Sequence, residues 1–304
     1  FNDNGNDAVT DKAAIEIGDG YDKSYTLTVN NATVNGFAIN PNGFNTGTTL
    51  WANKNSMPAD KLTVTVDGEN AYKAVVSTGD DFKAALSAGN NIVLAGDVNI
   101  SKIDLTSQTQ DIVIDGNGNT IKTTDSYGVE VTAGKNITLK NAKVEITKEG
   151  DYRTYAAGFK VSNGDYAGKT IKLENCEIRM ANTDWAYAVN MPAFVENLNL
   201  VIDNCTLEGA IALQCWGDNN TISVTDSKLI CNYTTNASYT SYCVALQGDG
   251  TNNAENNELY ISGCQFLYTG VDNFNSVIKS AADVPGKNTI EVSDCTYGEK
   301  VAQY

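Results

Sequence analysis

The chain of 304 residues contains no histidine and only two arginines, Arg153 and Arg179. Histidine is the usual general base, the commonest metal ligand and the partner of serine or cysteine nucleophiles, so all of these arrangements are excluded. Any catalytic group would have to be a carboxylate, lysine, arginine or tyrosine. We predict no catalytic residue, no metal site and no cofactor, and a non-catalytic role is favoured over an enzyme.

The sequence also lacks long apolar runs and an excess of positive charge. No run approaches the roughly 20 residues of a membrane-spanning helix. Asp and Glu number 37 against 21 Lys and Arg, a formal net charge of -16, which would repel the phosphates of nucleic acid. The opening FNDNGND has no apolar pattern and is typical of a tether. We therefore expect a secreted or bacterial cell-surface protein, with a lipid anchor before Phe1 as one arrangement.

A repeated strand pattern organises most of the chain. Alternating apolar residues end in a small polar residue and then Cys, Ser or Ala, and connections of varying length separate the copies. The copies are NITLKNA (136–142), TIKLENC (170–176), LNLVIDNC (198–205), TISVTDS (221–227), ELYISGC (258–264) and TIEVSDC (289–295). Regular strands with variable turns are typical of a β-helix, a solenoid of stacked coils.

A second family of strands follows the first. Its members are YGVEV (127–131), GFKV (158–161), AVNM (188–191), AIAL (210–213), CVAL (243–246) and SVIK (276–279). Two families predict at least two parallel sheets, with alternate side chains in a continuous core. Earlier coils are expected in NNIVLAGDVNI (90–100) and DIVIDGNGNTI (111–121).

The segment STGDDFKAALSAG (77–89) predicts an amphipathic helix over 80–88. Ser77 and Thr78 can cap its start, apolar residues recur at helical spacing, and Gly89 ends it. A short helix over the first coil would cap the solenoid and block edge-to-edge pairing.

The helix, the segments NNIVLAGDVNI and IDGNGNTI, and the repeated IxLxNC strands resemble the pectate-lyase-like superfamily of right-handed parallel β-helices. The resemblance covers about Val76 to Tyr304 and implies an all-β solenoid over residues 76–304. It says little about activity, because the superfamily includes lyases, hydrolases, phage tailspikes and non-catalytic adhesins. The adhesin-like members are the favoured comparison.

Residues 1–75 have a different texture. Short strands such as AAIEI, SYTLTV, VNGFAI and KLTVTV are separated by Gly, Asn and Pro turns. We predict a small antiparallel β module that follows a disordered N-terminal tether.

Cysteines recur at one position of the first strand family. Cys176, Cys205, Cys264 and Cys295 share a position with Ser227 and Ala142, which indicates a small residue facing a tight interior corner. Buried free thiols are predicted there. Cys231 and Cys243 instead flank a polar loop, and the sequence does not decide whether they form a disulfide.

Catalytic motifs are incomplete. Asn182, Thr183 and Asp184 resemble one motif of the polygalacturonase-type glycoside hydrolases, but such enzymes need further carboxylates on adjacent coils. A lyase would need a carboxylate cluster for Ca²⁺ and a base such as Arg153. The segment DGNGN (115–119) is interpreted as a turn rather than a metal loop.

Aromatic residues cluster around the second strand family and predict a flank with polar partners. The candidate ligand-binding residues are Trp185, Tyr187, Trp216, Tyr242, Asp184, Asp218, Gln214 and Gln247, with Tyr127 and Tyr155 on the same side. Flat rings beside hydrogen-bonding groups suit a sugar. The alternative to sugar binding is that these rings pack the long turns onto the coil below.

Two pairs are expected to stack on successive coils. Glu130 with Lys160 would form a charge pair, and Gln214 with Gln247 an amide ladder.

We therefore predict an adhesin-like, non-catalytic protein that binds glycan or a partner. The alternatives are a polysaccharide lyase or hydrolase acting on acidic polysaccharide, and a structural stalk.

Overall fold

The structure is a computed structural model. It describes residues 11–17, 25–30, 47–53, 62–66, 69–70, 73–87, 89, 91–108, 111–146, 156–180, 186–233, 242–247, 254–270, 277–280 and 287–298. The chain divides into two compact units, residues 1–95 and 96–304. A division into domains after residue 75 stays a prediction.

The unit of residues 1–95 begins with short paired strands. They are β1 (Asp11–Ile17), β2 (Tyr25–Val29), β3 (Gly47–Asn53), β4 (Leu62–Val66) and β5 (Glu69–Asn70). β1 pairs with β3 and β2 with β4, both in parallel, and only β4 and β5 are antiparallel. The antiparallel arrangement predicted for this region is therefore wrong for β1–β3 and β2–β4. The physical reason is connection length, because long segments separate those strands whereas two residues join β4 to β5.

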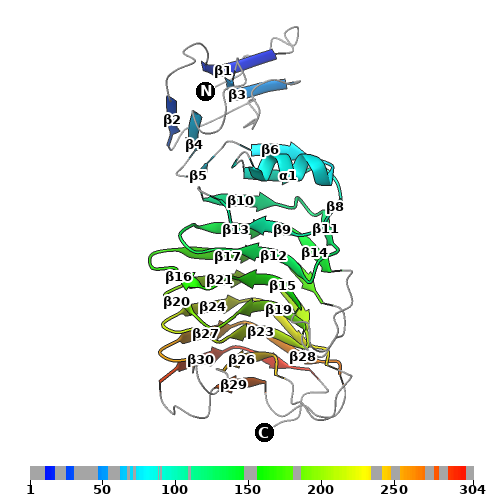
Figure 1. Ribbon diagram of the computed structural model, residues 1–304, viewed down its shortest axis with the longest axis vertical. Coiled ribbons are helices and arrows are strands. Elements are labelled where there is room, and N and C mark those ends of the chain that lie inside the picture. The colour runs from blue at the N-terminus through cyan, green and yellow to red at the C-terminus, as the bar shows by residue number, and fades with distance from the viewer. Residues whose placement is uncertain are drawn as a thin grey trace. The chain divides into compact units, whose positions relative to one another are not determined.

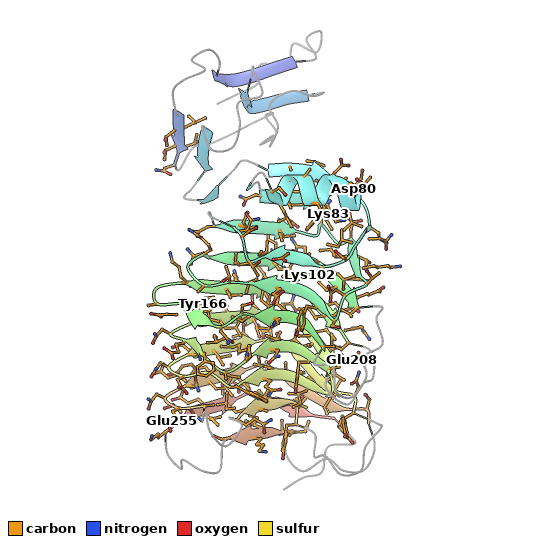
Figure 2. All side chains as sticks on the ribbon, viewed as in Figure 1. Asp80, Lys83, Lys102, Tyr166, Glu208 and Glu255 are labelled. Carbon is orange, nitrogen blue, oxygen red and sulfur yellow. The ribbon has the colours of Figure 1, made fainter. Side chains whose placement is uncertain are left out.

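Helix α1 (Gly79–Ser87) connects β6 (Lys73–Val76) to β7 (Asn91–Leu94), which pair in parallel. The hydroxyl of Thr78 accepts a hydrogen bond from the backbone N–H of Asp81 at 3.1 Å, so Thr78 is the N-cap. The buried Phe82, Ala85 and Leu86 face β6 and β7. Asp80 and Lys83 lie on the exposed side (Figure 2). The predicted amphipathic helix is confirmed.

Three parallel sheets form the unit of residues 96–304 (Figure 1). In this unit the first sheet contains β10 (Ile112–Asp115), β13 (Ile137–Lys140), β17 (Thr170–Glu174), β21 (Asn199–Asp203), β24 (Thr221–Thr225), β27 (Glu258–Ser262) and β30 (Thr289–Ser293). The second sheet contains β8 (Val98–Ile100), β11 (Thr120–Thr123), β14 (Lys143–Ile146), β18 (Glu177–Arg179), β22 (Thr206–Gly209), β25 (Lys228–Cys231), β28 (Gln265–Tyr268) and β31 (Thr296–Tyr297). The third sheet contains β9 (Ile103–Leu105), β12 (Tyr127–Val131), β15 (Ala156–Val161), β19 (Ala186–Met191), β23 (Ile211–Cys215), β26 (Val244–Leu246) and β29 (Ile278–Ser280). The short strands β16 (Gly164–Asp165) and β20 (Val195–Glu196) form a separate pair.

The chain visits the three sheets in turn and adds one strand to each per coil, so the predicted parallel β-helix is confirmed. Inward residues stack in columns, one of which runs through Leu139, Leu173, Ile202, Val224 and Ile261. All five are at most 1% exposed. Burial of each such side chain contributes roughly 1.5–3 kcal/mol, which explains why the alternation is so regular in the sequence.

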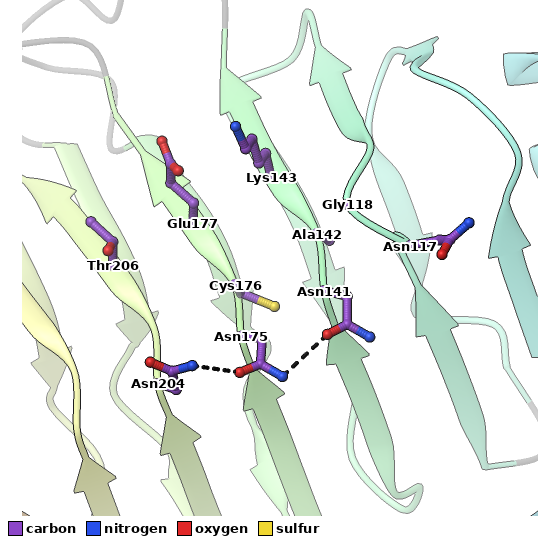
Figure 3. Close-up of a pocket in the computed structure, with 10 residues that line it drawn as sticks. All are labelled: Asn117, Gly118, Asn141, Ala142, Lys143, Asn175, Cys176, Glu177, Asn204 and Thr206. Carbon is purple, nitrogen blue, oxygen red and sulfur yellow. Dashed lines mark hydrogen bonds between the residues drawn. The ribbon is translucent and has the colours of Figure 1, made fainter.

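The turn between the first and second sheets repeats on successive coils. Asn141, Asn175 and Asn204 have φ of 50°, 53° and 49°, a left-handed conformation that asparagine tolerates. Asn204 Nδ2 donates to Asn175 Oδ1 at 2.7 Å, and Asn175 Nδ2 to Asn141 Oδ1 at 3.1 Å (Figure 3). This amide ladder ties neighbouring coils together.

The cysteine column lies just beyond the ladder. The backbone N–H of Cys176 donates to Cys205 Sγ, that of Cys205 to Ser227 Oγ, and that of Ser227 to Cys264 Sγ. The predicted free thiols are confirmed, with Cys295 partly exposed and the others in the column buried. Cys231 and Cys243 are also buried, and the structure has no disulfide between them.

No helix in the described part of the chain has both the length and the apolar character required to cross a bilayer.

Candidate functional site

Four polar residues occupy equivalent positions on adjacent strands of the third sheet. Glu130 on β12 pairs in register with Lys160 on β15, Lys160 with Asn190 on β19, and Asn190 with Gln214 on β23. The residues beside them in sequence, such as Val189, are buried in the core, so the four lie on the opposite, outer face of the sheet.

A pocket of about 220 Å³ lies over this part of the third sheet, and we call it the third-sheet pocket. Its lining residues come from four neighbouring coils and combine aromatic rings, amides and one cation. They are Tyr127, Lys160, Tyr187, Asn190, Pro192, Gln214 and Trp216.

Three polar atoms of this pocket, on Gln214 and Trp216, are buried without hydrogen-bond partners among the described residues. Gln214 is 1% exposed, and within the described part of the chain neither its amide nitrogen nor its amide oxygen has a hydrogen-bond partner. The indole N–H of Trp216 is also buried and has no hydrogen-bond partner among the described residues. An unpaired buried polar group costs roughly 1–3 kcal/mol. A ligand that accepts from Gln214 Nε2 and Trp216 Nε1, and donates to Gln214 Oε1, would remove this cost.

The single charged residue that lines the pocket among the described residues is Lys160. Its ammonium lies 2.9 Å from Glu130 Oε1 and 4.1 Å from the centroid of the Tyr127 ring. Glu130 Oε2 lies 2.6 Å from the ammonium of Lys102, which also contacts Asp104 at 3.1 Å. The predicted stacking of Glu130 on Lys160 is confirmed, within a four-residue charge cluster. Figure 2 labels Lys102.

The protonation of Glu130 follows from this cluster. Burial by itself would raise the pKa of its carboxyl, but hydrogen bonds from Lys102 and Lys160 outweigh burial and lower the pKa below its ordinary value. Glu130 is therefore ionised near neutral pH and compensates the charge of Lys160 at the edge of the pocket.

Of the eight residues predicted for ligand binding, Tyr187, Gln214 and Trp216 line the pocket together. Trp185 and Asp184 lie outside the described residues, as do Arg153 and the Asn182–Asp184 motif. The structure therefore brings three of the eight residues together, and their role in ligand binding stays a prediction.

Three other predicted residues do not line the third-sheet pocket. Tyr242 is 8% exposed, and the ammonium of Lys279 lies 5.0 Å from its ring centroid. Asp218 accepts a hydrogen bond from the backbone N–H of Glu255 at 2.8 Å, so its carboxylate supports a turn. Gln247 lies just beyond β26.

The predicted amide ladder between Gln214 and Gln247 is wrong. Gln214 pairs in register with Ala245 on β26, and Gln247 lies two residues farther along the chain. The residue stacked on Gln214 from the coil on its other side is Asn190. Asn190 and Pro192 are therefore lining residues that sequence reasoning missed. Extending the Glu130–Lys160 spacing by one coil would have reached Asn190.

A larger hollow of about 510 Å³ follows the asparagine ladder, with Lys143, Glu177 and Thr206 beside it (Figure 3). Its amides bond to one another from coil to coil, and Asn141 Nδ2 also donates to Asp115 Oδ1 at 3.1 Å. Because these groups already hold the turns together, we interpret this hollow as structural and the third-sheet pocket as the candidate site.

Metal-ligating side chains do not converge in the described ranges, where no group of three or more Cys, Asp or Glu is placed to hold an ion. The segment 115–119 forms a turn, with φ of 50° at Asn117 and 81° at Gly118. Asp115 Oδ1 accepts from the backbone N–H of Asn117 at 2.9 Å, which is the turn interaction expected for an aspartate.

The stacked sheets define the class of the protein, a parallel β-helix. Residues 73–192, from β6 to just beyond β19, match the family model described as "Putative pectate lyase-like adhesive domain". The resemblance inferred from the sequence is thus confirmed, and the matched segment includes β12, β15 and β19 of the candidate site. No curated protein and no solved structure matches the chain.

Proposed function

We propose that this protein is an adhesin-like β-helix, secreted or at the cell surface, that binds a glycan in the third-sheet pocket without catalysing a reaction. The observation that carries the proposal is the pair Gln214 and Trp216, whose buried polar atoms line the pocket and have no partner among the described residues.

Sugar chemistry meets the requirements of these atoms. Each hydroxyl both donates and accepts hydrogen bonds, so neighbouring hydroxyls of one ring can satisfy an amide and an indole together. The rings of Tyr127, Tyr187 and Trp216 supply apolar area for the C–H face of a sugar. Pockets that bind small ligands commonly combine such apolar walls with a few convergent polar groups.

The family match supports the adhesive role and the location. The matched family is an adhesive domain by its description, and an adhesive domain acts where a cell meets its surroundings. The matched residues include Tyr127, Lys160, Tyr187 and Asn190 of the pocket.

A glycan array tests the proposal. We expect the protein to bind a subset of glycans, and Trp216→Ala and Gln214→Leu to abolish that binding. Tyr260→Ala is the matched control, because Tyr260 lies on β27 of the first sheet, outside the pocket lining. Equal loss of binding in the control would assign the sugar to another surface.

Two further outcomes of the array contradict the proposal. Degradation of the arrayed glycans would favour a lyase or hydrolase. Silence on every glycan, with the wild-type protein folded, would favour a stalk or a protein-binding adhesin.

A further inference from the structure

The described charge cluster at the edge of the third-sheet pocket has a net charge of zero. Lys160 faces the pocket, but Glu130 holds its ammonium at 2.9 Å. Lys102 and Asp104 complete the cluster, which therefore contains two cations and two anions. A bound carboxylate would have to compete with Glu130 for Lys160, and Glu130 is fixed by two lysines. Within the described residues, the pocket thus offers no uncompensated positive charge to an acidic ligand.

The unpartnered atoms also discriminate against a carboxylate. An ionised carboxylate only accepts hydrogen bonds, whereas a hydroxyl also donates. A carboxylate at Gln214 could pair with Nε2 but would leave Oε1 buried, unpaired and next to negative charge. A hydroxyl pair can satisfy both atoms of the amide.

The net charge of the protein and the volume of the pocket also limit the ligand. The net charge of -16 disfavours the approach of polyanions, although salt screens this effect beyond about 8 Å at physiological ionic strength. The volume of about 220 Å³ falls below the roughly 300 Å³ at which pockets for drug-sized ligands begin. The pocket therefore suits one sugar ring rather than an extended segment of chain.

We propose that the third-sheet pocket recognises a single uncharged sugar residue through hydroxyls that both donate and accept at Gln214, and that it discriminates against the corresponding uronic acid. This inference rests on the proposed glycan-binding function and specifies its ligand class.

Matched sugar pairs test it. The methyl glycosides of glucose, galactose and mannose are compared with their uronic acid counterparts, which differ only in a carboxylate at C6. Saturation-transfer NMR with titration measures each affinity. We expect one or more of the neutral sugars to bind, and its uronate to bind at least about tenfold more weakly, the cost of one unpaired acceptor.

The outcomes separate the inference from the function on which it rests. Equal or tighter binding of the uronate would overturn the inference and leave the glycan-binding function standing. Absence of binding to every member of the pairs would overturn both.

The variant Glu130→Gln sharpens the test, because it frees the ammonium of Lys160 without altering a lining residue. We expect the ratio of uronate to neutral affinity to rise about tenfold. An unchanged ratio would mean that Glu130 does not set the charge preference.

A measurement on the unaltered protein covers the case in which this variant does not fold. Affinity for the neutral sugar should change less than about twofold between about 50 and 500 mM NaCl, because no net charge is neutralised on binding. A steep decrease with salt would overturn the inference.

Discussion

The ammonium of Lys160 lies 2.9 Å from the carboxylate of Glu130 on the neighbouring strand, and the second oxygen of that carboxylate lies 2.6 Å from the ammonium of Lys102. One carboxylate therefore joins successive coils of the third sheet and faces the edge of the candidate site. This arrangement links the stability of the solenoid to the electrostatics of the pocket.

Glu130→Gln should lower the free energy of unfolding by about 1–2 kcal/mol, because two lysines lose charge-assisted hydrogen bonds at a site that solvent screens only in part. Urea unfolding followed by circular dichroism measures the change. Lys122→Gln is the control, since its partner Glu145 lies 4.0 Å away and both side chains are about half exposed. A loss in the control as large as in Glu130→Gln would show that the charge cluster stabilises the fold no more than an exposed ion pair does.

The Glu130 contribution should depend on pH in a defined direction. Its folded pKa lies below the ordinary value of 4.5, so its stabilisation is present above that value and disappears as pH falls through the folded pKa. The stability difference between wild type and Glu130→Gln should therefore shrink below about pH 4. A difference that grows on acidification would contradict the assignment.

Gln214→Met should leave the free energy of unfolding unchanged or raise it by up to about 1 kcal/mol, because it replaces a buried unpaired amide by an apolar group of similar size. Sugar binding should disappear in the same variant. Asn220→Leu is the contrast, since Asn220 Nδ2 donates to Val195 O and its Oδ1 accepts from Leu198 N, both at 2.9 Å. That variant should lose roughly 2 kcal/mol or more. A comparable loss in Gln214→Met would reveal a structural role for its amide.

Asn175 should respond differently to alanine and to glycine. Asn175→Ala loses the ladder bonds and replaces asparagine, which tolerates φ of 53°, by alanine, which does not, so about 2–3 kcal/mol of stability should be lost. Asn175→Gly should lose about 1 kcal/mol less, because glycine adopts that conformation freely. Gly263, with φ 65°, occupies the same kind of turn on a later coil. Equal losses in thermal or urea unfolding would contradict the left-handed strain argument.

Thiol reactivity should report the burial of the cysteines. Burial raises the pKa of Cys215 to about 12 and that of Cys243 well above its ordinary value, whereas Cys295 is partly exposed. A thiol reagent at about pH 8 should modify one cysteine in the folded protein and all seven in denaturant. Only five reactive thiols in denaturant without reductant would indicate a disulfide between Cys231 and Cys243.

Much of the fold followed from local patterns. Alternating apolar residues and a small residue after each strand recur because every coil fills the same core and passes through the same turn, as Cys176, Cys205 and Ser227 do in their column. The helix start at Thr78 could likewise be predicted, because an N-cap acts within one helical turn.

The candidate site was only partly predictable. Tyr187 and Trp216 were found because aromatic residues beside polar ones are conspicuous in a sequence. Asn190 was missed, since a single asparagine in an apolar strand carries no such signal. The parallel pairing of β1 with β3 was also missed, because partner choice between distant strands depends on long-range packing.

The sequence by itself determined that most of this chain forms a parallel β-helix, because repeated alternation and repeated turn residues are local properties that every coil must satisfy. Only the tertiary structure decided the register of the third sheet. The sequence pattern predicts that Gln247 pairs with Gln214, whereas in the structure Gln214 pairs with Ala245. A two-residue shift keeps each side chain on the same face, so the pattern of burial cannot detect it. The register is settled by the pairing of strands that long connections separate. That pairing also determines which side chains meet in the pocket.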